Sequence, residues 1–160
     1  MGAGNDTVTA GTGADSITIT AGGTDKIVVA NGDSKAPTLI TLADTTTFLF
    51  AAADTITFGN GVDVVTGFTA GATGDTLDVT TAGAAITGIG VDAAALTATS
   101  ELFFSGAWDS STKVFTIAAD GAGADTLLVD TVDTVASTAD TWVVLVGVDS
   151  DNLHATATFV

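Results

Sequence analysis

The chain has 160 residues, enough for one ordinary domain or for two small layers that share a core, and its 46% hydrophobic content argues against disorder. Three lysines, no arginine and nineteen acids give a formal charge of −16, which makes nucleic acids and anionic membrane surfaces poor candidate partners and favours cations. The absence of cysteine excludes disulfides and thiolate zinc sites, and no apolar run is long enough for insertion into a membrane.

The first segment, "GAGNDTVTAGTGADSIT", contains the pattern Gly-x-Gly-x-Asp-x-apolar twice, with Asp6 and Asp15 nine residues apart. The five Gly-x-Gly-x-Asp copies in the chain are Gly2 to Asp6, Gly11 to Asp15, Gly59 to Asp63, Gly88 to Asp92 and Gly121 to Asp125. Shuffling a chain of this composition would give about 0.25 copies, so the pattern is a repeat. Looser relatives surround Asp25, Asp54 and Asp75.

The nine-residue spacing has a physical reason. A short strand and a tight turn need about nine residues, so eighteen residues close one coil of a flattened solenoid. Glycine permits positive φ and leaves backbone carbonyls accessible at the turn, and the aspartate adds a charged oxygen. Calcium takes six to eight oxygens, so the turns of adjacent coils can share an ion, and binding would then contribute to folding. The apolar position, occupied by Val8, Ile17, Val65 and Leu127, should point into the coil.

Alternating polar and apolar residues predict short strands in chain order. The clearest are "DSITIT" (15–20), "DTITF" (54–58), "KVFTIA" (113–118) and "HATATFV" (154–160). In the first, Ile17 and Ile19 should face inward, while Ser16, Thr18 and Thr20 face water. The best helical candidate is 90–103, where Asp92 could cap a short helix through Ala95 and Leu96.

These elements divide the chain into two regions. Repeats fill about 1–33 and 51–81, and a linker at about 34–50 holds the only proline, Pro37. From 82 to 160 the period fades into a more ordinary β pattern. The predicted fold is therefore all-β: an imperfect calcium-binding parallel β-roll or β-solenoid over 1–81, followed by a C-terminal antiparallel β region over 82–160.

The repeats resemble the hemolysin-type calcium-binding (RTX) nonapeptide, Gly-Gly-x-Gly-x-Asp-x-apolar-x. They differ at its first glycine, where this chain has Met1, Ala10, Phe58, Thr87 and Asp120. The resemblance implies a parallel β-roll with Ca²⁺ between coils, and the missing glycine predicts fewer or weaker ions. Two later segments, 64–80 and 108–129, are similar to the roll exit and the penultimate hairpin of proteins exported by type I secretion. Composition is most similar to that of bacterial surface-layer and extracellular matrix proteins.

We expect the metal ligands to come from the glycine-rich turns and their aspartates. The candidates are Gly2, Gly4, Asp6, Gly11, Gly13, Asp15, Asp25, Asp54, Gly59, Gly61, Asp63, Asp75, Gly121, Gly123 and Asp125.

No catalytic constellation is predicted. His154 is the sole histidine and no Gly-x-Ser-x-Gly elbow is present, so a structural or solvated role is expected for it. Glu101 is the only glutamate, and the aspartates in glycine turns are not expected to line an aromatic cleft of the kind that binds sugars. Trp108 and Trp142 are expected to be core or hairpin packing residues. The threonine pairs do not recur one coil later, which argues against an ice-binding ladder.

The sequence thus predicts a non-enzymatic, secreted calcium-binding structural protein that self-assembles into a surface layer or fibre, outside a bacterium or on its surface. Its expected partners are other copies of itself and the type I export machinery, with cell-surface polysaccharide as a further candidate. The N-terminus has no cleavable signal-peptide pattern. Two alternatives stay open: a calcium-triggered folding and type I export module from the C-terminus of a larger exoenzyme or adhesin, and a ligand-binding adhesin.

Overall fold

A computed structural model describes residues 1–29, 34–44, 49–79, 85–88, 93–94, 100–131 and 140–153. These residues form strands β1 to β14 and one short 3₁₀ helix, η1, so the all-β prediction is confirmed. The described residues contain no helix with the length and hydropathy needed to cross a membrane.

The strands of the first half are short, as expected for segments that alternate with glycine turns, and the longest strands follow residue 99. Their bounds are β1 (Thr7–Thr9), β2 (Ser16–Thr18), β3 (Lys26–Val29), β4 (Leu39–Thr41), β5 (Phe50–Ala51), β6 (Thr55–Thr57), β7 (Asp63–Thr66), β8 (Thr76–Val79), β9 (Ala85–Gly88), β10 (Ala93–Ala94), β11 (Ser100–Asp109), β12 (Val114–Ile117), β13 (Asp125–Thr131) and β14 (Thr141–Val146), with η1 at Ser150–Asn152.

Parallel pairing connects the repeat-bearing segments. The strands β1, β3 and β8 form a three-stranded parallel sheet in that order. The strands β2, β7 and β14 are likewise parallel neighbours at one side of the larger sheet. Thr7 pairs with Lys26, which pairs with Thr76, so equivalent positions of successive repeats lie side by side.

The larger sheet has nine strands and is mixed. Its order is β2-β7-β14-β13-β11-β12-β6-β4, with β9 beside β11. From β14 to β4 the neighbours on this path are antiparallel, so the antiparallel region predicted for the C-terminal half is present. It also takes in β4 and β6 from the first half. The segment between β3 and β7 is too long for a nine-residue half coil, and its described part adds strands to this antiparallel edge instead.

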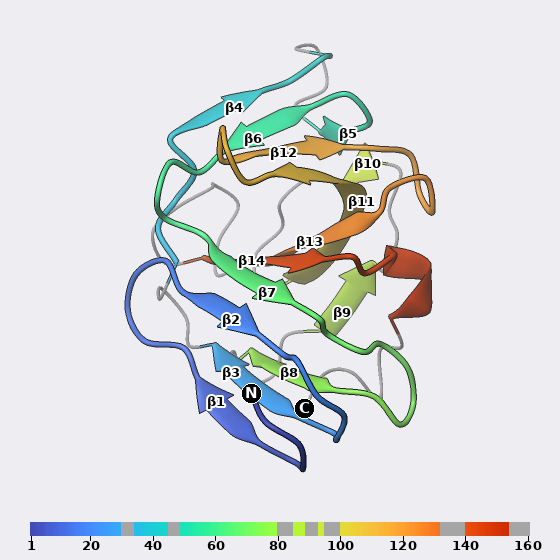
Figure 1. Ribbon diagram of the computed structural model, residues 1–160. Coiled ribbons are helices and arrows are strands. Elements are labelled where there is room, and N and C mark those ends of the chain that lie inside the picture. Colours follow the sequence, from blue (N-terminus) through green and yellow to red (C-terminus); the bar gives the residue numbers. More distant parts are fainter. Residues whose placement is uncertain are drawn as a thin grey trace.

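The two halves of the sequence share this sheet. In its order, β14, β13, β11 and β12 from after residue 81 lie between the pairs β2–β7 and β6–β4 from before it. The predicted linker at 34–50 contains β4, which pairs with β6. Figure 1 shows β1, β3 and β8 at one end of the molecule and β4 and β6 at the opposite end.

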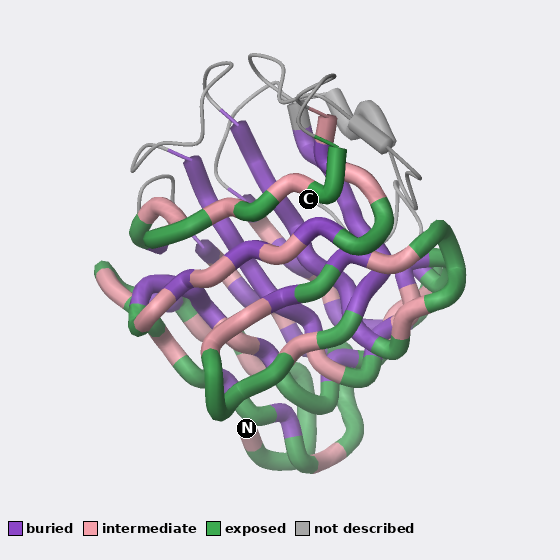
Figure 2. The backbone as a smooth tube through the Cα atoms, turned by 90° about the horizontal axis from the view of Figure 1, so that it is seen from above, coloured by how far each residue is buried: buried purple, intermediate pink, exposed green. Residues whose placement is uncertain are grey.

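Two hydrophobic clusters lie on the two faces of the nine-stranded sheet. The first joins the face that includes Ile17, Val65 and Val143 to the three-stranded sheet, which contributes Ile27 and Leu77. Figure 2 shows buried stretches crossing the interior and exposed residues concentrated in the outer loops. Burial of these apolar side chains is the main stabilising contribution to the fold.

The second cluster fills the other face, where the sheet coils so that β6 and β12 approach β14. Ile56, Phe115 and Val144 are fully buried there, and the ring of Phe58 contacts that of Trp142 with a centroid distance of 5.6 Å. The prediction that Trp142 is a core residue is therefore confirmed.

Several strand predictions are tested directly. The segments at 15–20, 54–58 and 113–118 contain β2, β6 and β12. Ile17 and Ile19 are buried, and Ser16, Thr18 and Thr20 are exposed, as the alternation predicts.

Other expectations fall partly or wholly outside the described residues, namely Asp92 with its copy of the motif, the helix at Ala95 and Leu96, and His154 with the strand at 154–160. On either side of that expected helix, 93–94 and 100–103 are strand rather than helix, because they pair with β5 and β13.

Candidate metal site in the stacked turns

The first two copies of the motif share one turn geometry. In each, the glycine two residues before the aspartate has a positive φ, +112° at Gly4 and +121° at Gly13. Gly2 and Gly11 do not. Left-handed backbone of this kind strongly favours glycine, which explains the repeat at that position.

Close stacking adds a second reason for glycine at Gly23, which precedes Asp25. A Cβ at Gly23 would lie 1.9 Å from the carbonyl oxygen of Gly4 in the adjacent turn. The same turns are joined by a hydrogen bond from the Gly4 N–H to the Gly22 carbonyl at 3.0 Å. Backbone of one turn therefore lies directly on backbone of the next.

Two later copies have the same letters but a different turn. In the pairs Gly59/Gly61 and Gly121/Gly123, the first glycine has the positive φ, +60° and +65°. The second glycine is required by close approach instead. A Cβ at Gly123 would lie 2.1 Å from the backbone nitrogen of Gly106, and one at Gly61 would lie 2.8 Å from Lys35 Cβ.

Three aspartates form a column along the turns that precede β1, β3 and β8. The Asp6 N–H donates to Asp25 Oδ1 at 2.8 Å, and the Asp25 N–H donates to Asp75 Oδ1 at 2.8 Å. Asp75 Oδ2 accepts from the Thr69 N–H at 2.7 Å. The carboxylates of Asp25 and Asp75 thus each hold the turn of the neighbouring repeat, and these hydrogen bonds link Asp6, Asp25 and Asp75 in one column.

A second, shorter column precedes β2 and β7. The Asp15 N–H donates to Asp63 Oδ1 at 2.7 Å, while Asp15 Oδ2 accepts from the Gly11 N–H. On β14 the residue opposite Asp63 is Val143, so among the described residues the column of aspartates ends at β7. Ser34, which precedes β4, lies between β7 and β14: its Oγ donates to the Trp142 carbonyl at 2.7 Å and also lies 3.3 Å from Asp63 Oδ2.

Asp54 and Asp125 belong to neither column. Both oxygens of Asp54 accept backbone N–H groups, from Ala43 at 2.6 Å and Ala51 at 2.7 Å. Asp125 accepts from Trp108 and Gly147, which ties the ends of β11 and β14 to β13. Backbone donors satisfy these carboxylates, so as metal ligands both are weaker candidates than the column aspartates.

Two carboxylate oxygens of the first column, unlike those of Asp54 and Asp125, accept no backbone N–H group from the described residues. Among the described residues, Asp6 Oδ2 and Asp25 Oδ2 are buried and accept no hydrogen bond. A buried anionic oxygen without a partner is costly. In the described part of the chain a single ion pair forms, between Lys26 Nζ and Asp78 Oδ2 at 2.8 Å, so no lysine neutralises these two aspartates. No group of three or more metal-ligating side chains gathers within the described residues.

Sequence reasoning missed an acidic pair in the antiparallel region. Glu101 on β11 and Asp130 on β13 are cross-strand partners, and both are buried. Burial, and secondarily the charge of Asp130, raise the pKa of Glu101 to about 7. No local motif marks these residues, because only the strand register places them together.

In the turn between β11 and β12, hydrogen bonding lowers the pKa of a carboxyl group. Ser111 and Thr112 donate to the exposed carboxylate of Asp109, and these bonds lower its pKa to about 2.

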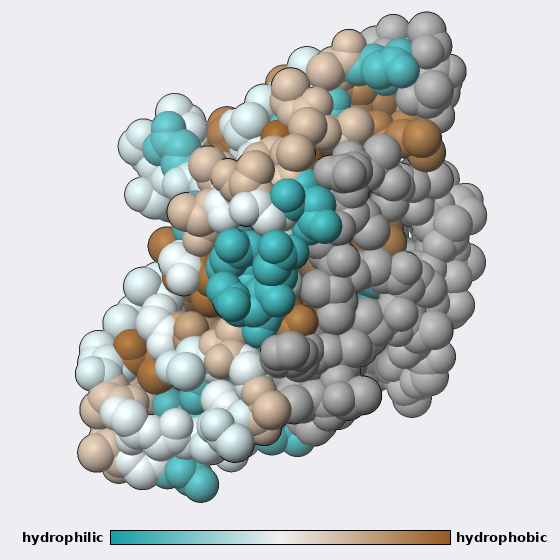
Figure 3. Space-filling view, turned by 90° about the vertical axis from the view of Figure 1, so that its right-hand side faces the viewer, coloured by the Kyte–Doolittle hydropathy of each residue, from teal (hydrophilic) through white to brown (hydrophobic). Residues whose placement is uncertain are grey.

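The charge of the chain is distributed over the surface as well as within the turns. On the face shown in Figure 3, hydrophilic residues gather near the middle of the described surface.

No known protein family and no curated protein matches this chain. The resemblance to calcium-binding repeat proteins therefore stays a prediction.

Proposed function

We propose that this chain is a non-enzymatic calcium-binding structural protein that is secreted and self-assembles at a bacterial surface. The observation that carries the proposal is the column of Asp6, Asp25 and Asp75, in which two buried carboxylate oxygens have no hydrogen-bond donor. A cation is the simplest group that would neutralise them.

The chemistry of the column fits calcium. The Oδ2 atoms of Asp6 and Asp25 are hard anionic oxygens from adjacent turns, and glycine turns leave backbone carbonyls accessible as further oxygen ligands. With two carboxylates available, most of the remaining ligands would be carbonyls and water. Bound calcium would supply positive charge between turns that otherwise bring like charges together.

The parallel pairs support a short, interrupted β-roll as the finer fold. The strands β1, β3 and β8 would form one wall, and β2, β7 and β14 the other. The residues between β3 and β7 would be an insertion that leaves the roll and joins the antiparallel sheet.

Open sheet edges support self-assembly. In the described part of the chain, β1 ends the three-stranded sheet and β2 ends the nine-stranded one, so both strands that carry the first two copies of the motif are edges. The Asp6 carbonyl and the Ala10 N–H bond to β3, and alternation therefore directs the N–H groups of Thr7 and Thr9 away from it. β4 ends the opposite side of the large sheet and exposes Leu39 to 59%. Edges of this kind favour pairing with another copy.

Calcium titration by calorimetry tests the metal assignment. We expect the double variant Asp6→Asn/Asp25→Asn to bind fewer ions than the wild type. The matched control is Asp54→Asn, which neutralises one buried aspartate whose two oxygens already accept N–H groups. Equal stoichiometry in all three proteins would contradict a site in this column.

The alternative is a calcium-triggered folding module for type I export. Among the described residues, the outer edge of β1 pairs with no strand, and on the outer edge of β2 the Thr18 carbonyl accepts from the Met1 ammonium group at 2.6 Å. The edge of β1 would suit a preceding coil of a longer polypeptide as well as a second copy. This alternative predicts that calcium makes the protein compact without assembling it, whereas the structural role predicts ordered particles. The hypothesis of an adhesin leads to the groove described next.

A further inference from the structure

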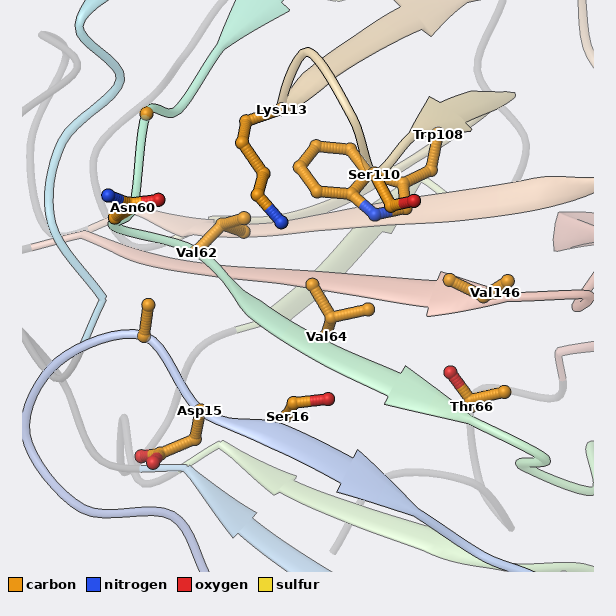
Figure 4. Close-up of a pocket in the computed structure, with 12 residues that line it drawn as sticks. Asp15, Ser16, Asn60, Val62, Val64, Thr66, Trp108, Ser110, Lys113 and Val146 are labelled. Atoms are coloured by element: carbon orange, nitrogen blue, oxygen red, sulfur yellow. The ribbon is translucent and has the colours of Figure 1, made fainter.

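A groove of about 590 Å³ opens between the β11–β12 hairpin and the strands β2 and β7. Figure 4 shows the hairpin residues Trp108, Ser110 and Lys113 on one side and Asp15 and Ser16 on the other, with Val64 and Val146 between them. The volume lies within the range of about 300–1,000 Å³ that is typical of ligand sites.

The floor of the groove is apolar because the coiled sheet does not close here. Val62, Val64 and Val146 belong to or border the second hydrophobic cluster, and both Val64 and Val146 are only partly buried. At this point the core face of the sheet therefore reaches the surface.

Trp108 supplies an aromatic wall that is held in place. Its ring packs at 6.1 Å from that of Phe58, and its backbone N–H donates to Asp125 at 2.7 Å. The ring remains partly exposed and lines the groove. A partly exposed indole next to an apolar floor is a suitable surface for the apolar face of a sugar ring.

Lys113 adds the groove's positive charge. It adopts an unusual φ of +60° for a lysine, and the turn that holds it is fixed by bonds from its N–H to the Asp109 carbonyl and from the Phe58 N–H to its own carbonyl. Lys113 is not part of the described ion pair. Its ammonium group is therefore available to an oxygen ligand.

Short polar side chains complete the lining. Asp15, Ser16, Asn60 and Ser110 come from three separate turns or strands and provide both donors and acceptors. Hydroxyl, amide and carboxylate groups around an aromatic wall match the many hydroxyls of a carbohydrate. With one lysine and an acidic residue in the lining, the groove does not suit a nucleic-acid backbone.

We propose that this groove binds a saccharide that carries a carboxylate, with a sugar ring against Trp108 and the carboxylate on Lys113. The inference goes beyond the calcium-dependent structural role, because it assigns a ligand class and a site on a different part of the sheet. It would give an assembling protein a means of attachment to an acidic polysaccharide.

Calorimetric titration of the full chain with tetragalacturonate and with the neutral tetrasaccharide maltotetraose, at one fixed free calcium concentration, tests the proposal. We expect the acidic sugar to bind about tenfold more tightly than the neutral one, because of a charge-assisted contact. Lys113→Gln should remove this preference, and Trp108→Ala should weaken both sugars about tenfold.

Lys35→Gln is the control, since it removes a lysine that does not line the groove. Lys113→Gln changes a partly exposed side chain, so it keeps the test informative if Trp108→Ala does not fold. Failure of both sugars to bind, or equal binding of the acidic sugar to wild type and Lys113→Gln, would overturn the proposal. A calcium stoichiometry measured in the same Lys113→Gln protein would be unchanged in either case, so the calcium assignment is tested separately.

Discussion

Replacement of Asp25 by asparagine is predicted to have an effect on stability that depends on calcium. Asp25 Oδ1 accepts the Asp6 N–H at 2.8 Å, and asparagine keeps an oxygen for that bond. The other carboxylate oxygen, Oδ2, is buried without a partner, and the change removes its negative charge from a position between Asp6 and Asp75.

The expected magnitudes follow from these two contacts. Without calcium, a neutral acceptor in place of a charged one costs about 1 kcal/mol, while the change replaces a buried unpaired anionic oxygen by a buried amide NH₂ group that also needs a partner, so these two costs largely cancel. The free energy of unfolding should therefore change by no more than about 1 kcal/mol. With calcium at about one hundred times its dissociation constant, the wild type gains about 2.7 kcal/mol and a variant that has lost the site gains nothing.

Urea unfolding followed by tryptophan fluorescence, in chelator and in millimolar calcium, measures both quantities, since Trp142 is fully buried. Asp54→Asn is the matched control. It loses an acceptor for a backbone N–H and should cost about 1–3 kcal/mol in both solutions. The reasoning is refuted if Asp25→Asn lowers stability by the same amount with and without calcium.

Three further predictions concern the acidic pair, the stacked turns and the sheet edge. Because the pKa of Glu101 is about 7 in the folded protein and 4.5 in the reference state, the folded form holds the proton more strongly, and stability falls as pH rises through this interval. Glu101→Gln should therefore raise the free energy of unfolding at pH 8 relative to pH 4 by up to about 3 kcal/mol, and urea titrations with the same gain at both pH values would contradict this. Gly23→Ala should lower the free energy of unfolding by more than about 2 kcal/mol, because the added Cβ meets backbone of the adjacent turn. Gly71→Ala is its control, since the site has open space and the change carries only the cost of a φ of +116°. Equal losses of stability for the two variants in chemical denaturation would show that the turns are not closely stacked. Thr9→Pro removes an N–H that faces away from β3 and should prevent calcium-dependent assembly while it leaves monomer unfolding within about 1 kcal/mol; particles of unchanged size in light scattering would exclude β1 as the contact.

Local pattern predicted the local structure well. The alternation around Ile17 and Ile19 gave their burial, and the motif predicted that turns of successive repeats stack, as those of Asp6 and Asp25 do. The exact register was wrong: a coil of eighteen residues would set Thr7 beside Asp25, whereas Thr7 pairs with Lys26. These features depend on a few adjacent residues and on the turn chemistry of each repeat.

The parts of the fold and of the site that the sequence did not predict depend on contacts between distant segments. Asp125 has the same motif as Asp15, but its carboxylate accepts N–H groups from the ends of β11 and β14, which the motif alone does not reveal. Likewise, the pairing of Glu101 with Asp130 follows from strand register. The partners of an antiparallel strand are chosen by packing over the whole sheet, so a single segment does not encode them.

The most direct test of the account is electron microscopy of the purified protein in chelator and then in millimolar calcium. The account predicts dispersed particles in chelator and ordered sheets or filaments once calcium is added. Particles that become compact but stay separate in calcium, or assemblies that form equally well in chelator, would contradict the claim that calcium controls the assembly of this protein.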